Sequence, residues 1–342
     1  MPANLSPEYK AAEAEFRQAR TTEDRLTWLR EMLRTVPKHK GTEHLQADIK
    51  TRIKELTEEL AGPRKGGART GPATVVRREG AGQVALLGPP NSGKSALHAR
   101  LTGSRADVEP YPFTTHFPQP GMLPYEDIGI QVIDLPPVSD QHPVPWLANA
   151  LQPADGCLLV VDLSQPDCVE QLVEVHDLLA ARRVSLTGDW AMPEGEHAGE
   201  DEDEDQDPFA VRLATLLVAT KADLLSEPEE ELAAFRDLTG HVYPAVAVST
   251  ATGHGVDEIG PFLFDHLGVV RVYTKAPGRP PDLGRPFIVG HGQSVYDVAE
   301  LVHKELAVGL RFARLWRGGG IEGRQVGRDH PVEDGDILEL HA

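Results

Sequence analysis

The stretch GPPNSGKS, Gly88 to Ser95, decides the fold of this chain. It matches the phosphate-binding loop Gly-x4-Gly-Lys-[Ser/Thr], and it stands between the apolar run VALL and the helical pattern SALHARL, as that loop requires. Lys94 is expected to neutralise the β- and γ-phosphate oxygens, and Ser95 to ligate Mg²⁺. The backbone N–H groups predicted to face the phosphates belong to Asn91, Ser92, Gly93, Lys94, Ser95 and Ala96. The stretch therefore predicts a P-loop nucleotide site.

Short apolar runs alternate with helical lengths of chain around this loop and after it. The runs are QVALLG, IQVIDL, GCLLVVDL, ATLLVAT and VYPAVAVS. Strands that are buried on both faces and separated by helices are typical of a parallel sheet. We therefore predict an α/β domain with a mostly parallel sheet over residues 79–268.

The chain before this domain is helical and then basic. Helix caps at Ser6 and Thr21, and an amphipathic stripe from Thr42 to Leu60, predict a helical N-terminal region over residues 1–61. The stretch GPRKGGARTG combines glycine and proline with three cations, which is typical of a flexible linker. We assign that linker to residues 62–78.

The chain after Gly268 changes again, because short strand patterns there surround one helical segment. This texture predicts a small α+β domain over residues 269–342.

Charge follows the same division of the chain, since the net charge of −19 is not spread evenly. Residues 1–80 hold 16 Lys and Arg against 12 Asp and Glu, residues 81–270 hold 8 against 31, and residues 271–342 hold 10 against 10.

Nine of the acidic residues lie in EGEHAGEDEDEDQD, residues 194–207. The run has neither hydrophobic periodicity nor turn chemistry, so we predict a disordered acidic loop within the α/β domain. A solvated loop is favoured over a docking segment for a basic partner.

Composition excludes several classes of protein. No apolar run approaches the ~18 residues that span a bilayer, and the first residues lack the apolar core of a secretory signal. We therefore expect a cytoplasmic protein without a membrane partner. Cys157 and Cys168 are the two cysteines, and they offer neither a disulfide framework nor a zinc site.

Two further motifs bear on the base of the nucleotide. TKAD directly follows the strand ATLLVA, so Asp223 is expected at the ligand-binding edge of the sheet. A carboxylate there accepts hydrogen bonds from guanine N1–H and N2–H₂, whereas adenine offers no such pair of donors. STA follows VYPAVAV, where a loop can donate a backbone N–H to guanine O6. The residues predicted to bind GTP at the base are Thr220, Lys221, Asp223, Ser249, Thr250 and Ala251, and an ATP-dependent phosphotransferase is disfavoured.

The stretch IQVIDLPPVSD has the shape of a strand that ends in a metal-site aspartate, Asp134, followed by a loop that usually reads Asp-x-x-Gly. Pro137 takes the place of the glycine, and proline has no backbone N–H to donate. Loss of one comparable donor costs ~10²–10³ in rate. Two alternatives stay open: either the γ-phosphate is poorly coupled to this loop, or Val138 or Ser139 supplies an N–H instead.

Taken in order, these motifs resemble the Obg-related GTPases, in which GPPNSGKS is followed by YPFTT (residues 111–115), DLPP, TKAD and STATGHGVDEI. HKGTEHLQADIKTRIKELTEELAGPRKGG near the N-terminus, and RVYTKAPGRPPD and RQVGRDHPVEDGDILEL near the C-terminus, look most like the developmentally regulated GTP-binding proteins. The resemblance covers nearly the whole chain and implies a P-loop GTPase domain followed by a β-grasp TGS domain. The chain departs from that family in lacking its long insertion within the GTPase domain, and in Pro137.

The resemblance also implies roles for individual residues. Thr115 matches a switch residue whose hydroxyl ligates Mg²⁺ and whose backbone reaches the γ-phosphate, with Thr114 beside it at the nucleotide. Asp134 matches the carboxylate that holds Mg²⁺ through water. Asn91 matches a loop asparagine that is associated with K⁺ in cation-dependent GTPases. Val138 stands where Ras-type proteins have a catalytic glutamine, so no catalytic residue is assigned.

For the C-terminal domain the resemblance implies contact with RNA or the ribosome, to which the basic linker would add, whereas composition alone leaves a protein-binding module equally open. The cations concerned are Arg271, Lys275, Arg279, Arg285, Lys304, Arg311, Arg314, Arg317, Arg324 and Arg328. We therefore expect a protein that binds GTP and GDP and hydrolyses GTP slowly with Mg²⁺, as a regulatory switch in translation or on RNA. The alternative is a GTP-binding scaffold with negligible hydrolysis because of Pro137.

Overall fold

The computed structural model describes residues 6–19, 21–37, 42–60, 74–104, 117–190, 210–317 and 323–342. The chain forms two units, one of residues 1–72 and 200–210 and a larger one of residues 73–199 and 211–342. Most of the predicted basic linker, the motif YPFTT and the acidic stretch 194–207 lie outside the described residues.

The smaller unit contains three helices, and the first two begin where the capping residues predict. They are α1 (Pro7–Gln18), α2 (Thr22–Thr35) and α3 (Glu43–Leu60). The side chain of Ser6 accepts a hydrogen bond from the backbone N–H of Tyr9, and that of Thr21 accepts one from Asp24. The helices bury one shared apolar cluster, whose largest fully buried members are Tyr9, Leu29, Met32 and Ile49. The predicted helical N-terminus is confirmed.

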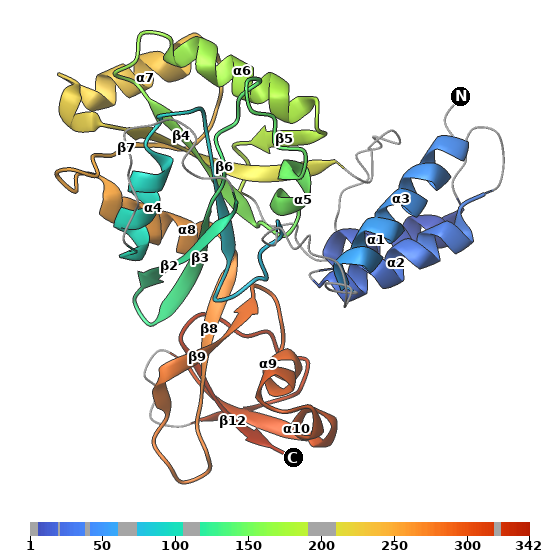
Figure 1. Ribbon diagram of the computed structural model, residues 1–342. Helices are drawn as coiled ribbons and strands as arrows, with labels where there is room; N and C mark the ends of the chain where they lie inside the picture. Colours follow the sequence, from blue (N-terminus) through green and yellow to red (C-terminus); the bar gives the residue numbers. More distant parts are fainter. Residues whose placement is uncertain are drawn as a thin grey trace, which may run out of the picture. The chain divides into compact units, whose positions relative to one another are not determined.

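The larger unit is built on a seven-stranded sheet (Figure 1). Its strands are β1 (Gln83–Leu87), β2 (Gln119–Tyr125), β3 (Ile128–Asp134), β4 (Gly156–Asp162), β5 (Val184–Thr187), β6 (Val211–Thr220) and β7 (Ala245–Ala247). Their order is β2-β3-β1-β4-β6-β5, and β7 also pairs with β6. Every pairing is parallel except that of β2 with β3. The predicted α/β fold with a mostly parallel sheet is confirmed.

Helices cover both faces of this sheet (Figure 1). They are α4 (Lys94–Thr102), α5 (Leu147–Leu151), α6 (Cys168–Ala180), α7 (Pro228–Thr239) and α8 (Ile259–His266). One apolar cluster joins the sheet to α5, α6 and α7, and a second joins it to α4 and α8. The central strands are therefore buried on both sides, which explains their unbroken apolar sequences.

Two strands, β2 and β5, were not predicted. β2 lies at the edge of the sheet, buries Leu123 alone and contains Pro120 and Pro124, so its sequence QPGMLPY carries no apolar signal. Proline is tolerated in edge strands because one side of such a strand has no ladder partner. β5 is four residues long, which is too short for a pattern to be recognised.

The C-terminal domain is a second sheet with helices on one face. Its elements are β8 (Val269–Thr274), β9 (Asp282–Gly290), α9 (Val295–Val302), α10 (Lys304–Gly309), β10 (Phe312–Trp316), β11 (Arg324–Val326) and β12 (Asp336–His341). The strand order is β11-β10-β12-β8-β9, with β12 and β8 parallel and the other pairs antiparallel. Its core lies between the sheet and the two helices and includes Val272, Val295, Val298 and Leu338.

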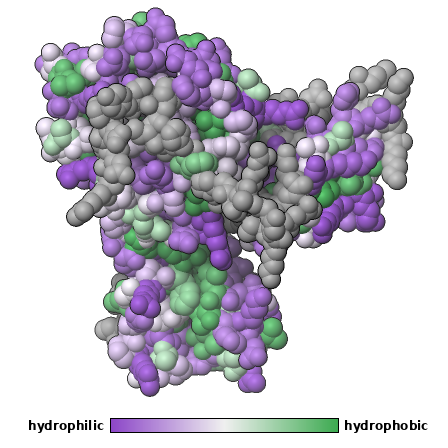
Figure 2. All heavy atoms as spheres, in the orientation of Figure 1, coloured by the Kyte–Doolittle hydropathy of each residue, from purple (hydrophilic) through white to green (hydrophobic). Residues whose placement is uncertain are grey.

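Surface chemistry differs between the two domains of the larger unit. Figure 2 shows a mostly hydrophilic surface on the α/β domain, whereas apolar side chains gather in a band on the C-terminal domain. None of the helices within the described ranges has the length and apolar character that crossing a membrane requires.

Three stacked aromatic rings pack α6 against the chain that follows α7. The rings of His176 and His241 lie 4.1 Å apart between centroids, and that of Tyr243 lies 5.3 Å from His241. Burial, reinforced by the neighbouring His241 and opposed by Asp177, lowers the pKa of His176 to about 4. The folded chain therefore holds His176 neutral at pH values where the unfolded chain protonates it.

This difference predicts a stability loss in mild acid. Between pH 6.5 and 4 the unfolded state binds a proton at His176 that the folded state does not. The free energy of unfolding should therefore decrease as the pH is lowered through this range. At pH 5 the loss should be about 2 kcal/mol. His176→Phe keeps a ring in the stack, and chemical denaturation at pH 7 and pH 5 should show that most of this loss has gone. His291→Phe, at an exposed position, is the control. An unchanged pH dependence in His176→Phe would contradict the assignment.

Candidate nucleotide site

The C-terminal ends of the parallel strands meet at one edge of the sheet. Asp134 ends β3 beside Leu86 of β1, and Asp162 ends β4 beside Thr220 of β6. The loops that follow these strands therefore surround one position, which is where open α/β sheets bind ligands.

The loop after β1 turns at glycines that no other residue could replace. Gly88 has a φ of +149°, and a Cβ atom there would lie 2.2 Å from the carbonyl oxygen of Val160. Gly93 has a φ of +90° and Asn91 a φ of 60°, so both occupy the left-handed region. Helix α4 begins directly afterwards at Lys94, and its positive end faces the loop. This geometry is that of an anion-binding loop.

Lys94 lies inside the loop rather than in solvent. Its Nζ atom donates hydrogen bonds to the carbonyl oxygens of Gly88 (3.1 Å) and Pro89 (2.9 Å). Burial lowers the pKa of Lys94 to about 8, although the charge of Asp134 opposes that shift. A phosphate would provide the negative charge that this buried ammonium lacks.

Ser95 and Asp134 lie together on the other side of the loop. The Ser95 hydroxyl donates to Oδ2 of Asp134 at 2.6 Å, and Asp134 is 1% exposed. Two adjacent hard oxygen donors suit Mg²⁺, which takes few protein ligands and completes its shell with water and phosphate. Nowhere in the described ranges do three His, Cys, Asp or Glu side chains gather as a metal site, so no competing centre is found there.

Thr220 has a different role from the one that TKAD suggested. Its buried hydroxyl donates to the carbonyl oxygens of Ser92 (2.6 Å) and Val161 (3.1 Å). It therefore ties the end of β6 to the P-loop and to β4. The side chain holds the loop in place, and its assignment to GTP binding stays a prediction.

The two base motifs are neighbours in the structure. The Ser249 hydroxyl donates to Oδ1 of Asp223 at 2.5 Å, and the backbone N–H of Ala222 donates to the Val248 carbonyl oxygen at 3.0 Å. Ser249 is buried while Asp223 is exposed. The carboxylate is therefore oriented by a fixed hydroxyl and still accessible to a ligand.

Asp162 was missed by the sequence analysis. Its Oδ2 atom pairs with Nζ of Lys221 at 2.5 Å, and it also accepts hydrogen bonds from Ser164 and Gln165. Burial alone would raise the pKa of Asp162, but these hydrogen bonds, that of Lys221 foremost, outweigh it and lower the pKa. The run GCLLVVDL ends in an aspartate as IQVIDL does, and that shared pattern could have indicated it.

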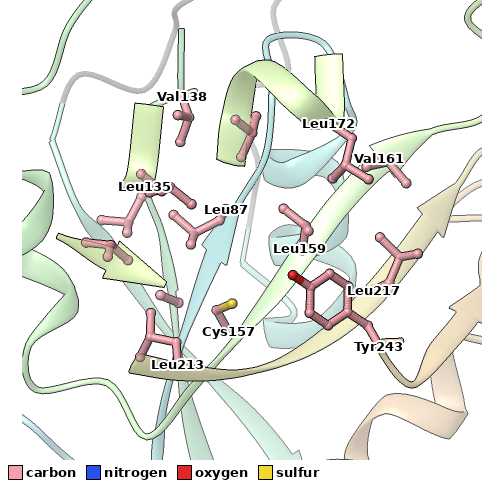
Figure 3. Packing of buried hydrophobic residues seen from close by; sticks show 14 of the residues in the cluster. Leu87, Leu135, Val138, Cys157, Leu159, Val161, Leu172, Leu213, Leu217 and Tyr243 are labelled. Atoms are coloured by element: carbon pink, nitrogen blue, oxygen red, sulfur yellow. The ribbon is translucent and has the colours of Figure 1, made fainter. Parts of the chain in front are cut away.

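The loop after Asp134 is part of the core. Residues 135–139 are all buried, and Leu135 and Val138 pack in the same cluster as Leu87 (Figure 3). The backbone N–H of Val138 donates to the carbonyl oxygen of Gly88 at 3.0 Å. In this structure one of the two amides considered as substitute donors for Pro137, that of Val138, is therefore bound to the P-loop.

The remaining predicted residues divide into two groups. Ser92, Gly93 and Ala96 lie in the loop and first turn of α4, while Thr250 and Ala251 follow Ser249. Thr114 and Thr115 lie outside the described residues, so their assignment to the nucleotide and Mg²⁺ stays a prediction. The structure brings the described residues that were predicted for phosphate, Mg²⁺ and base to one edge of the sheet, and their roles stay predictions.

Two family models match the chain. A model described as a 50S ribosome-binding GTPase matches residues 83–187, and a model described as the TGS domain matches residues 270–342. The first match contains the P-loop and Asp134, and the second contains nearly all of the C-terminal domain. The GTPase and TGS domains implied by the sequence resemblance are confirmed.

Known proteins share about a quarter of their residues with this chain over almost its whole length. An uncharacterized GTP-binding protein of Methanocaldococcus jannaschii is 27% identical, over 93% of this chain and 92% of that protein. Developmentally-regulated G-protein 1 of Arabidopsis thaliana is 25% identical, over 91% of this chain and 88% of that protein. Ribosome-interacting GTPase 1 of Saccharomyces cerevisiae is 24% identical, over 94% of this chain and 99% of that protein.

The role of Thr220 generates a prediction about the P-loop. Thr220→Val keeps the shape of the side chain but removes the hydroxyl, so the carbonyl oxygens of Ser92 and Val161 lose a donor. Chemical denaturation should show a loss of about 1–3 kcal/mol in the free energy of unfolding. GTP and GDP affinities should fall by the same factor, because the hydrogen bonds of the Thr220 hydroxyl support the whole loop and not one phosphate. Thr220→Ser should behave like the native chain. A Thr220→Val variant with native stability and affinity would refute this role of the hydroxyl.

Proposed function

Because this chain is a GTP-binding protein of the developmentally regulated, Obg-like kind, we propose that it is a slow Mg²⁺-dependent GTPase acting as a regulatory switch in translation or on RNA. The observation that carries the proposal is the shared edge at which Lys94, Ser95 and Asp134 lie near the Asp223–Ser249 pair. The first three suit a metal-bound triphosphate, and the last two suit guanine.

Slow hydrolysis is supported by the loop after Asp134. Val138 stands where Ras-type proteins have a glutamine, but its side chain is 4% exposed and belongs to the core. Pro137 has no N–H, and the N–H of Val138 is bonded to Gly88. Donors to a developing charge on the γ-phosphate are therefore scarce on this side of the site.

The cofactors of the proposed site are Mg²⁺ and K⁺. Ser95 and Asp134 would hold Mg²⁺, with Thr115 as a third ligand. K⁺ is proposed because Asn91, with its left-handed backbone, occupies the loop position that the resemblance associates with that ion. Hydrolysis should then be faster in potassium than in sodium salts.

A role in translation is supported by the match to the 50S ribosome-binding GTPase family and by the similarity to Ribosome-interacting GTPase 1 of Saccharomyces cerevisiae. Cations of the TGS domain add to it. Arg271, Lys275 and Arg317 form ion pairs, and Arg328 lies over the ring of Tyr296. Six cations have neither an ion pair nor a ring contact with any residue that the structure describes, and these could meet phosphates: Arg279, Arg285, Lys304, Arg311, Arg314 and Arg324.

The alternative is a GTP-binding scaffold that hydrolyses nothing at a useful rate. The buried loop 135–139 favours it, because a segment packed in the core moves little when a γ-phosphate is lost. The two proposals share the nucleotide site and differ only in turnover.

Base recognition tests the shared part of both proposals. Asp223→Asn should lower guanine nucleotide affinity about 100-fold, equivalent to about 2.8 kcal/mol, since a charge-assisted pair of hydrogen bonds is lost. Xanthine nucleotides, which carry an acceptor in place of the guanine amino group, should gain affinity. Competitive titration measures both, with Asp237→Asn on the exposed face of α7 as the control. Equal affinity of the native chain for ATP and GTP would overturn the proposed function.

Turnover separates the switch from the scaffold. The native chain should hydrolyse GTP slowly in single-turnover assays with Mg²⁺ and K⁺, and Pro137→Gly should raise the rate toward ~10²-fold by restoring an N–H donor. Pro136→Gly changes the adjacent residue of the same loop and should leave the rate low. Fast hydrolysis by the native chain would contradict the slow GTPase, whereas no detectable hydrolysis in either protein would favour the scaffold.

A further inference from the structure

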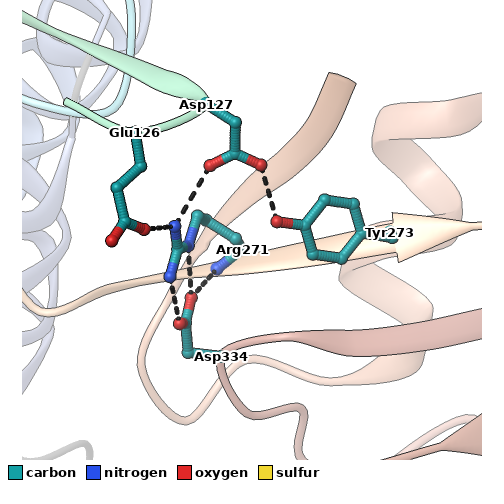
Figure 4. Close-up of polar contacts among 5 residues, drawn as sticks. All are labelled: Glu126, Asp127, Arg271, Tyr273 and Asp334. Atoms are coloured by element: carbon teal, nitrogen blue, oxygen red, sulfur yellow. Dashed lines mark hydrogen bonds and ion pairs between the residues drawn. The ribbon is translucent and has the colours of Figure 1, made fainter. Parts of the chain in front are cut away.

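The turn between β2 and β3 contacts the TGS domain through exposed side chains. Glu126 and Asp127 form this turn, and both contact Arg271 of β8 (Figure 4). The Arg271 guanidinium donates from Nη1 to Glu126 and, at 3.1 Å, to Asp127. The hydroxyl of Tyr273, from the same strand, donates to Oδ2 of Asp127 at 2.6 Å.

Arg271 is also fixed from within its own domain. Its Nε and Nη2 atoms donate to the two oxygens of Asp334, at 3.0 and 2.7 Å, and its backbone N–H donates to Asp334 at 2.7 Å. The guanidinium lies 4.7 Å from the ring centroid of Phe264 in α8, and that ring packs on Tyr125 at the end of β2. One side chain, 14% exposed, therefore joins the turn, α8 and the TGS domain.

Lysine could not replace this arginine. The planar guanidinium group of Arg271 holds its N–H donors in fixed directions. Here they bind Glu126 and Asp127 on one side and Asp334 on the other. Without the guanidinium, three carboxylates would face one another with no cation between them. The contact between the turn and the TGS domain would then depend on Tyr273 and apolar packing, and the repulsion among the three carboxylates would oppose it.

The same hairpin reaches the nucleotide site at its other end. β2 and β3 pair along seven residues, from Tyr125 opposite Ile128 at the turn to Gln119 opposite Asp134. Among the described residues no further strand pairs with β2 on its outer side, while α4 and α8 pack against it and Arg271 fixes the turn. A rigid two-stranded element thus connects Arg271 to the proposed Mg²⁺ ligand.

We propose that Arg271 is a positioning residue through which the TGS domain holds the β2–β3 hairpin, and with it Asp134, in the arrangement that binds Mg²⁺ and nucleotide. The inference rests on the proposed function and adds its regulation. β3 stays paired with β1 when Arg271 releases the turn, so the contact restrains only the turn and β2, whose added motion would have to be lost when the metal binds, at a cost in affinity. By linkage, metal-bound nucleotide stabilises the docked TGS domain by the same factor.

The test measures how much Mg²⁺ strengthens nucleotide binding in the full chain. Fluorescent GDP and a non-hydrolysable GTP analogue are titrated with Mg²⁺ and with EDTA, for the native chain, Arg271→Gln, Arg271→Lys and Tyr273→Phe. Arg271→Gln and Arg271→Lys should each reduce the enhancement by Mg²⁺ at least fivefold and leave the affinities in EDTA within about twofold. Tyr273→Phe removes one oxygen and should give an intermediate reduction. Arg212→Gln, exposed on β6, loses the same charge elsewhere and should match the native chain.

Hydrogen exchange supplies the reciprocal measurement. Mg²⁺ and nucleotide should increase the protection of the β8 amides in the native chain but not in Arg271→Gln. A native enhancement by Mg²⁺ in Arg271→Gln, even with lowered thermal stability, would show that Arg271 only supports the fold. If that variant fails to fold, Tyr273→Phe decides by the same criterion. A native chain that binds no nucleotide would instead overturn the proposed function itself.

Discussion

The nucleotide site depends on the close approach of Gly88 to Val160. Because Gly88 has no side chain, the backbone of the P-loop can rest against the end of β4, where a Cβ atom would lie 2.2 Å from the Val160 carbonyl oxygen. The carbonyl oxygen of Gly88 then receives Lys94 from one side and the N–H of Val138 from the other. Loop, lysine and the segment after Asp134 thus share one backbone group.

This arrangement bears directly on the choice between switch and scaffold. A nucleotide switch needs a segment whose position changes with the γ-phosphate, yet residues 135–139 are packed in the core. The hairpin β2–β3 is the more exposed neighbour of Asp134, and it ends against the TGS domain. If nucleotide state is communicated in this protein, the hairpin offers a path that does not need the loop at Pro137 to move.

Sequence and structure agree where a motif is local. GPPNSGKS predicted the loop, its strand and its helix because all three adjoin one another in the chain, and the parallel sheet followed from runs buried on both faces. Arg271, by contrast, was predicted from sequence only as one of the cations of an RNA-binding surface. Its partners Glu126 and Asp127 are more than 140 residues away, and no periodicity links residues so distant. Thr220 shows the same limit, since its carbonyl partner Ser92 is 128 residues away.

The prolines that hid β2 from the sequence analysis have a consequence for the behaviour of the protein at high concentration. Pro120 and Pro124 are an even number of residues apart, so their nitrogens lie on the same side of the strand. A second molecule that tried to extend the sheet at this edge would find donors missing at both places. The opposite edge is formed by β5 and β7, which are only four and three residues long. Both borders of the sheet therefore resist strand addition, which is a common first step in aggregation.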